Sequence, residues 1–295
     1  MPKKLETSTA ISAAVALVLW ASAFAGIKAG LKGFGPGELA LLRFGTASLV
    51  LAVFALVTRM RLPDLADIPK IGFASVLGIT IYHLCLNFGE TTVTAGAASL
   101  IIASGPIFTA LLAMLFLKER LTAWGWAGIA VAFSGVALIT LGEGTGGLAF
   151  QPAAMLVLVA AVSTAAYFVA SKPLLRKYAP LEFTSYAIWL GTVPMLVFSP
   201  GLLSELPHAP LSATISVIYL GVFPGAIAYA LYSGVLSKLP ASIASSFLYV
   251  QPVTATIIAW VWIREVPSLV TLVGGALALV GVALVSTRGR LPVKS

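Results

Sequence analysis

Long, uninterrupted apolar stretches constrain the fold of this chain more than any other feature. Turn and charge signals separate ten of them, at residues 8–29, 37–57, 71–88, 96–117, 123–141, 152–171, 181–198, 212–232, 241–263 and 268–286. A helix needs about 20 apolar residues to cross a bilayer, whereas β-barrel strands would alternate over about ten. With 59% hydrophobic and only 9% charged residues, a soluble domain could not cover its surface. We therefore predict an all-α integral membrane protein with ten transmembrane helices.

A repeat spacing relates the two halves of the sequence. Pro106 and Pro252 are 146 positions apart, and this spacing also superimposes Glu119 on Glu265. The same spacing superimposes the run that begins at Gly135 on the run that begins at Gly281. Nearer the start of each half, a spacing of 144 superimposes Phe24, Lys28, Pro36 and Glu38 on Phe168, Lys172, Pro180 and Glu182. Such self-similarity indicates duplication. We predict one five-helix repeat over residues 1–143 and another over 148–295. Since five is odd, the second repeat is inverted in the membrane.

The basic residues predict the orientation of the chain. Fourteen fall on one side of the predicted helices: Lys3, Lys4, Arg59, Arg61, Lys70, Lys118, Arg120, Lys172, Arg176, Lys177, Lys238, Arg288, Arg290 and Lys294. Only Lys28, Lys32 and Arg264 fall toward the other side. By the positive-inside rule, both termini are cytoplasmic. The basic residues thus account for the net charge of +8 by orienting the protein in the membrane, and the charge does not indicate nucleic-acid binding.

Two further features limit the possibilities. The first apolar stretch has a counterpart in the sixth, so we expect it to be retained and not cleaved as a signal peptide. Cys85 is the sole cysteine, which excludes intrachain disulfides and cysteine-cluster metal sites. We expect no cofactor.

Several motifs, in their order and duplication, carry a family resemblance. They are Leu19-Trp20-Ala-Ser-Ala-Phe24 leading to Lys28, Pro36-Gly-Glu38-Leu-Ala-Leu-Leu-Arg43-Phe44, Gly105-Pro106, Lys118-Glu119-Arg120-Leu121, and the Gly-Val-Ala-Leu run that ends each repeat. The chain resembles the drug/metabolite transporter superfamily, specifically its EamA-like ten-helix exporters, and among them the YddG-type bacterial amino-acid exporters. The resemblance implies that the two repeats form one transport domain that moves small metabolites by alternating access.

Matched helix breaks mark the expected binding site. A proline inside a helix removes a backbone bond and clashes with the preceding turn, and carbonyls freed in lipid must face protein or a watery cavity. Gly105-Pro106 and Gln251-Pro252 would therefore line the site, unless they only shape helix packing. We take as candidate substrate-binding residues Trp20, Tyr82, His83, Asn87, Ser104, Pro106, Phe168, Tyr229, Tyr249, Gln251 and Pro252. Each aromatic residue and His83 also has a plainer interpretation as a packing residue.

Five charged residues near helix ends are candidate gating or structural charges: Lys28, Glu38, Arg43, Glu119 and Glu265. Glu38 and Arg43 are five positions apart, so pairing or snorkelling near the membrane edge is the favoured interpretation. For Glu119 and Glu265 we favour interfacial ion pairs over gate latches.

The expected solute is an amino acid, an aromatic or other neutral amphipathic one included, or a similar small metabolite. The predicted fourth and ninth helices contain no Lys or Arg, which disfavours a phosphorylated solute. No P-loop is present, and because the apolar stretches lack a central Asp or Glu, we expect facilitative export. The alternatives are a multidrug or metabolite exporter, or an importer, coupled to protons, with His83 as the carrier. An enzyme is disfavoured because His83 and His208 are the only histidines. We expect a monomer.

Overall fold

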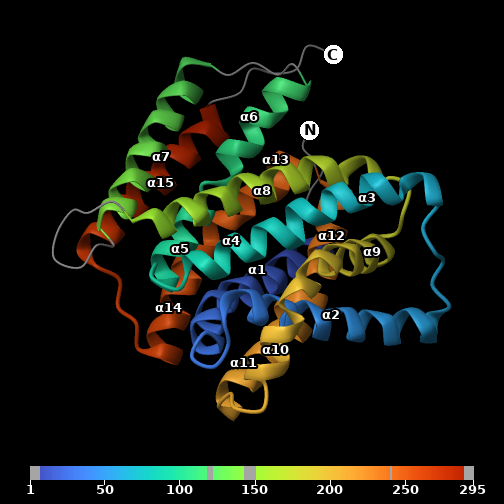
Figure 1. The fold of residues 1–295 in the computed structure, drawn as a ribbon. Coiled ribbons are helices and arrows are strands. Elements are labelled where there is room, and N and C mark those ends of the chain that lie inside the picture. The colour runs from blue at the N-terminus through green and yellow to red at the C-terminus, as the bar shows by residue number, and fades with distance from the viewer. Residues whose placement is uncertain (1–6, 118–121, 143–150, 240, 289–295) are drawn as a thin grey trace.

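The computed structural model describes residues 7–117, 122–142, 151–239 and 241–288, and within these ranges every regular element is a helix (Figure 1). Seven helical segments are long and apolar enough to cross a bilayer: Thr7–Gly30, Pro36–Thr58, Leu65–Gly89, Ala95–Leu112, Pro152–Leu174, Pro180–Glu205 and Leu211–Lys238. Shorter apolar helices cover Ala123–Ile139, Phe247–Ile263 and Leu269–Val285. The predicted all-α membrane class is therefore confirmed.

The helices follow one another with short connections. Those before residue 143 are α1 (Thr7–Gly30), α2 (Pro36–Thr58), η1 (Leu65–Asp67), α3 (Ile68–Ser75), η2 (Val76–Ile81), α4 (Tyr82–Gly89), α5 (Ala95–Ile102), α6 (Gly105–Leu117) and α7 (Ala123–Gly142). Those after residue 150 are α8 (Pro152–Leu174), α9 (Pro180–Thr192), η3 (Val193–Phe198), α10 (Ser199–Glu205), α11 (Leu211–Leu220), η4 (Gly221–Ile227), α12 (Ala228–Lys238), α13 (Ala241–Ser246), η5 (Phe247–Val250), α14 (Gln251–Ile263) and α15 (Leu269–Arg288). Prolines begin α2, α8 and α9, where the missing N–H costs no helical bond. The predicted boundary between the halves, between residues 143 and 148, lies outside the described residues.

Each half packs its first long helix against the other half. Helix α1 lies against α11, α12 and α14, while α8 lies against α4, α5 and α6 (Figure 1). Helix α2 packs on α9 and η4, and α9 in turn contacts η2. The centre of the molecule is therefore built from both halves, which is the place where a duplicated transporter forms its binding site.

Helices α7 and α15 pack closely through four glycines. A Cβ atom added at Gly135 would lie 2.4 Å from the backbone oxygen of Gly274, and one added at Gly281 would lie 2.5 Å from that of Gly128. Small residues let transmembrane helix backbones approach in this way. These glycines are related by the spacing of 146, as Gly128 matches Gly274 and Gly135 matches Gly281.

The helix breaks lie where the prolines predicted them. Helix α5 ends at Ile102 and α6 begins at Gly105, while the 3-10 segment η5 separates α13 from α14, which begins at Gln251. Two π-helical segments were not predicted. Both η2 and η4 are π-helical, and they interrupt the corresponding helices of the two halves just before α4 and α12. π-Helical segments often occur at functional sites because they disturb the regular backbone bonding.

Candidate functional site

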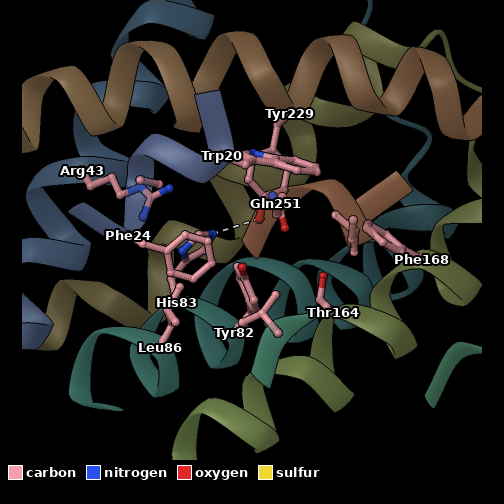
Figure 2. Close-up of a pocket in the computed structure, with 13 residues that line it drawn as sticks. Trp20, Phe24, Arg43, Tyr82, His83, Leu86, Thr164, Phe168, Tyr229 and Gln251 are labelled. Atoms are coloured by element: carbon pink, nitrogen blue, oxygen red, sulfur yellow. Dashed lines mark hydrogen bonds between the residues drawn. The ribbon is translucent and has the colours of Figure 1, made fainter. Parts of the chain in front are cut away.

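A small cavity lies between the halves at the centre of the fold (Figure 2). Its walls come from α1, α2, α4, α5, α8, α12, η5 and α14. Six of the residues predicted for the site line it: Trp20, Tyr82, His83, Phe168, Tyr229 and Gln251. The cavity volume is about 30 Å³, which is above the about 10–15 Å³ that one water molecule needs. The expected solute, an amino acid, is much larger than water, so its binding requires the walls to move apart.

Corresponding positions of the two halves line this cavity together. Four pairs of lining residues are 144 or 146 positions apart: Trp20 and Thr164, Phe24 and Phe168, His83 and Tyr229, and Ile102 and Leu248. Away from the cavity, the Ser48 and Thr192 hydroxyls, 144 positions apart, lie 3.2 Å from each other. Residues that the repeat spacing superimposes therefore lie near one another in the structure, and several of them line the same cavity.

A hydrogen-bond chain joins the halves beside the cavity. His83 Nε2 lies 2.9 Å from the Tyr229 hydroxyl, shown by the dashed line in Figure 2, and this hydroxyl donates to the Gly78 backbone oxygen at 3.2 Å. Because the hydroxyl has one proton to donate, His83 donates through Nε2, so Nδ1 becomes an acceptor. That Nδ1 atom is buried and has no hydrogen-bond partner.

The π-helical segments supply the backbone acceptors of other bonds between the halves. Trp20 Nε1 donates to the Pro224 backbone oxygen in η4 at 3.1 Å, and Ser163 Oγ donates to the Leu77 backbone oxygen in η2 at 2.7 Å. In η4 the Ala228 N–H bonds to the Phe223 oxygen and bypasses that of Pro224, whereas the Leu77 oxygen in η2 also accepts from the Tyr82 N–H and uses its second lone pair for Ser163. The bonds hold α1 against η4 and α8 against η2.

Arg43 corrects the sequence-based interpretation. It was expected at the membrane edge with Glu38, but its side chain is 1% exposed and lines the cavity, and its Nε and Nη1 atoms have no hydrogen-bond partner. The Glu38 carboxyl lies instead against Gly35 and Gly201 at the end of the bundle. The guanidinium carbon is 5.2 Å from the centre of the Phe44 ring. Packing of α2 against α9 and η4 places the Arg43 position inside the protein.

Five residues predicted for the site do not line this cavity: Asn87, Ser104, Pro106, Tyr249 and Pro252. Asn87 Nδ2 donates to the Pro36 backbone oxygen at 3.0 Å, and Ser104 Oγ donates to the Ile101 backbone oxygen at 2.6 Å. Both prolines are buried in the first turn of a helix, and Tyr249 packs against a separate apolar cluster around Ile107. The breaks place neighbouring residues, Ile102, Leu248 and Gln251, on the cavity wall instead.

The remaining charged residues at the helix ends lie in different surroundings. Glu265 Oε1 accepts a bond from the Gly96 backbone N–H at 3.4 Å, and Lys28 is partly exposed at the end of α1. Glu119 lies outside the described residues. Sequence reasoning missed Glu90, which follows α4 directly, is fully buried and has two carboxylate oxygens without a hydrogen-bond partner. The only feature of the sequence that pointed to Glu90 was its position just after the apolar stretch 71–88.

Polar contacts connect the halves at both ends of the bundle. Lys177 Nζ is 2.5 Å from carboxylate oxygens of both Asp64 and Asp67, and the Tyr178 hydroxyl donates to Asp67 at 2.7 Å. The hydrogen bonds that Lys177 donates to Asp64 and Asp67 raise its pKa above the ordinary value. At the other end, the Glu205 carboxylate accepts a bond from the Gly35 N–H at 2.9 Å.

Comparison with known proteins identifies the family. The model of the EamA-like transporter family matches residues 7–141 and 151–287. The chain is 45% identical to the uncharacterized transporter YdfC of Bacillus subtilis, over 95% of this chain and 91% of YdfC. It is 41% identical to a probable terminal-alkyne amino-acid exporter of Streptantibioticus cattleyicolor, over 96% of this chain and 95% of that protein.

More distant matches agree with this assignment. The uncharacterized inner membrane transporter YedA of Escherichia coli is 26% identical over 82% of this chain and 78% of YedA. A solved crystal structure has the same fold, with a TM-score of 0.64 at 21% identity over 95% of this chain and 96% of that one. The chain therefore belongs to the EamA-like transporter family of the drug/metabolite transporter superfamily, and it is a multi-pass transporter of the inner membrane.

Proposed function

We propose that this transporter exports amino acids, aromatic and other neutral amphipathic ones included, by alternating access. In this proposal the chain crosses the membrane ten times as two inverted five-helix repeats, residues 1–143 and 148–295, with both termini in the cytoplasm. The excess of Lys and Arg on one side of the apolar stretches supports the orientation. Since one chain encloses the cavity between its own halves, a monomer is the proposed working unit.

The unpaired polar atoms of the cavity carry the proposal. Arg43 presents two buried donors without partners, whereas His83 Nδ1 and Gln251 Oε1 are buried acceptors without partners. Unsatisfied buried donors, acceptors and charges are costly, so a ligand that pairs with them gains affinity. An amino-acid zwitterion complements this set, because its carboxylate accepts hydrogen bonds and its ammonium donates them.

The aromatic side of the cavity fits an apolar amino-acid side chain. In Figure 2, Arg43 and Phe168 lie on opposite sides of the cavity, with Trp20 and Tyr229 between them. Trp20 packs edge-on against Tyr229 with ring centroids 5.2 Å apart. A solute held by its carboxylate near Arg43 would direct its side chain toward these rings. The similarity to a probable terminal-alkyne amino-acid exporter supports the same class of solute.

A counterflow assay tests the solute class. Liposomes that contain the purified protein are loaded with unlabelled compound, and the uptake of its labelled form is followed. We expect exchange of L-phenylalanine and other neutral amino acids, but little exchange of phenethylamine, which lacks the carboxylate, or of 3-phenylpropionate, which lacks the ammonium. Equally fast exchange of phenethylamine would contradict the proposal and indicate an exporter of organic cations.

We also propose that export is facilitative. His83, the carrier expected for proton coupling, is 2% exposed and already bonds to Tyr229, so it has a structural partner. His83→Gln should therefore still support counterflow in liposomes without a pH gradient. Accumulation driven by an imposed pH gradient in the wild type, and lost in His83→Gln, would show proton coupling through this residue.

A further inference from the structure

A groove at one end of the bundle lies between the two halves, apart from the central cavity. It has a volume of about 340 Å³, and its walls include Phe54, Arg59, Arg61, Leu181 and Glu182. The first three belong to the end of α2 and the segment that follows it, and the other two belong to the first turn of α9, which packs on α2 (Figure 1). In the proposed orientation this end of the bundle faces the cytoplasm.

The two arginines of the groove lack the carboxylate partners that a neighbouring basic residue has. Lys177, at the same end of the bundle, is 2.5 Å from carboxylate oxygens of both Asp64 and Asp67. Within the described part of the chain, neither Arg59 nor Arg61 takes part in an ion pair. Both side chains are exposed at the groove, so their charges are free to bind an anion.

Glu182 is the one carboxylate among the described residues that line the groove, and it does not neutralise the arginines. Its Oε2 atom accepts a bond from the Ala179 N–H at 3.0 Å. Two arginines and one glutamate leave the groove with one net positive charge. A ligand with a single negative charge complements this set, and phosphate oxygens match the planar fork of an arginine side chain.

The backbone fixes the segment that carries both arginines. Arg59 ends α2 with φ 50° and ψ 47°, in the left-handed region, and its N–H bonds to the Ala55 and Leu56 oxygens. The Tyr186 hydroxyl of α9 donates to the backbone oxygen of Arg61. The segment is therefore held on the second half without a ligand, and this preorganisation lowers the entropic cost of binding one.

The groove continues from the arginines onto apolar side chains. Phe54 is 41% exposed and lies about 6 Å farther into the apolar stretch than Thr58, one turn later in α2. Met60 and Leu181 line the same groove and are partly exposed. A charged rim above an apolar wall matches a phospholipid, whose phosphate lies at the membrane surface and whose chains lie in the hydrocarbon core. Basic pockets between transmembrane helices on the cytoplasmic side bind anionic headgroups in this way.

We propose that a phospholipid with a single negative charge binds in this groove, with its phosphate at Arg59 and Arg61 and an acyl chain along Phe54 and Leu181. The groove shares no lining residue with the central cavity. Only the leaflet depends on the proposed orientation, and the binding depends on neither the solute nor the direction of transport. Because the lipid contacts α2 of one half and α9 of the other, it stabilises the contact between the halves.

The test measures lipid binding by the purified transporter in a neutral detergent. Phosphatidylglycerol is titrated in, and native mass spectrometry counts the lipid that the protein retains. Arg59→Asn, which suits the left-handed conformation, and Arg61→Gln should each weaken retention by about fivefold, and together by about 25-fold. Arg176→Gln is the matched control, since Arg176 is exposed near the same end but does not line the groove; it should change retention by less than about twofold.

Melting in detergent gives a second measurement. Phosphatidylglycerol should raise the melting temperature of the wild type more than phosphatidylcholine does, because a ligand of the folded state stabilises it, and the double variant should lose this difference. Equal retention of the two lipids, or equal losses in Arg176→Gln and the double variant, would overturn the proposal, because the attraction would then have no defined site. Displacement of the lipid by millimolar inorganic phosphate would also overturn it and indicate a site for a soluble anion. Since no arm measures transport, a failure of amino-acid exchange in liposomes would contradict only the proposed function.

Discussion

Replacing Arg43 by Gln should weaken solute binding and strengthen the fold, and these opposite effects make the substitution informative. In the structure the side chain is 1% exposed and two guanidinium nitrogens have no partner. A hydrogen bond to a charged group contributes about 1.5–3 kcal/mol. Loss of even one such bond to a solute carboxylate corresponds to an affinity about 10- to 150-fold lower.

The same substitution removes a buried positive charge whose Nε and Nη1 atoms have no hydrogen-bond partner. The contact of Arg43 with the Phe44 ring offsets this by only about 0.5–1 kcal/mol, so we expect the melting temperature in detergent to rise. For a large domain each kcal/mol corresponds to about 2–4 °C. Fluorescence-monitored melting measures the stability, and the concentration dependence of counterflow measures the affinity. An unchanged half-saturation concentration, or a melting temperature that falls together with transport, would refute the reasoning.

Three further substitutions test the helix packing, the site and the contacts that join the halves. Gly135→Ala should destabilise the protein by about 1–3 kcal/mol, because the added methyl group meets the α15 backbone. Gly234→Ala is the control, since its methyl group meets nothing within 4 Å, and thermal melting compares the two variants. Tyr82→Ala should change which amino acids compete in counterflow, whereas Tyr249→Ala, which lies off the cavity, should leave the competition profile as it is. Lys177→Met should alter the exchange rate by no more than about fivefold, since the Lys177 and Asp64 side chains are 49% and 64% exposed, exposed ion pairs contribute about 0–1 kcal/mol, and the buried Asp67 keeps its bond from Tyr178.

Local chemistry made part of the site predictable. Proline must interrupt a helix wherever it occurs, so both breaks followed from Pro106 and Pro252 alone. Aromatic residues on the helices that flank the breaks were reasonable lining residues, and Trp20, Phe168 and Tyr229 do line the cavity. The prolines could not predict which residues line the cavity. The helices restart at Gly105 and Gln251, so both prolines lie in a first helical turn, and Ile102, Leu248 and Gln251 line the cavity instead.

The depth of the charges was not predictable, because tertiary packing sets it. Arg43 lies in the second turn of a helix, where a basic side chain ordinarily reaches the membrane edge. Its burial arises because η4 and α9 cover that face of α2. Glu90 follows an apolar stretch and would be exposed on an isolated helix, yet the end of α4 packs against α8 of the other half. The π-helical η2 contains no proline, so nothing in its sequence predicted the irregular winding.

Some residues that line the cavity are the same at corresponding positions of the two halves, and others differ. In the proposed cycle these two kinds of residue have different roles. Phe24 and Phe168 present the same ring from both halves, so in the proposed inverted arrangement each can take the place of the other when the access state changes. A zwitterion, however, has two different ends and cannot be oriented by identical residues from both halves. Its orientation must come from positions at which the halves differ, and these include Arg43, opposite Ala187 in the alignment of the halves, Gln251, opposite Gly105, and His83, opposite Tyr229. We therefore expect substitution of Phe24 or Phe168 to change the rate of exchange more than its selectivity, and substitution of Arg43, Gln251 or His83 to change which solute is carried.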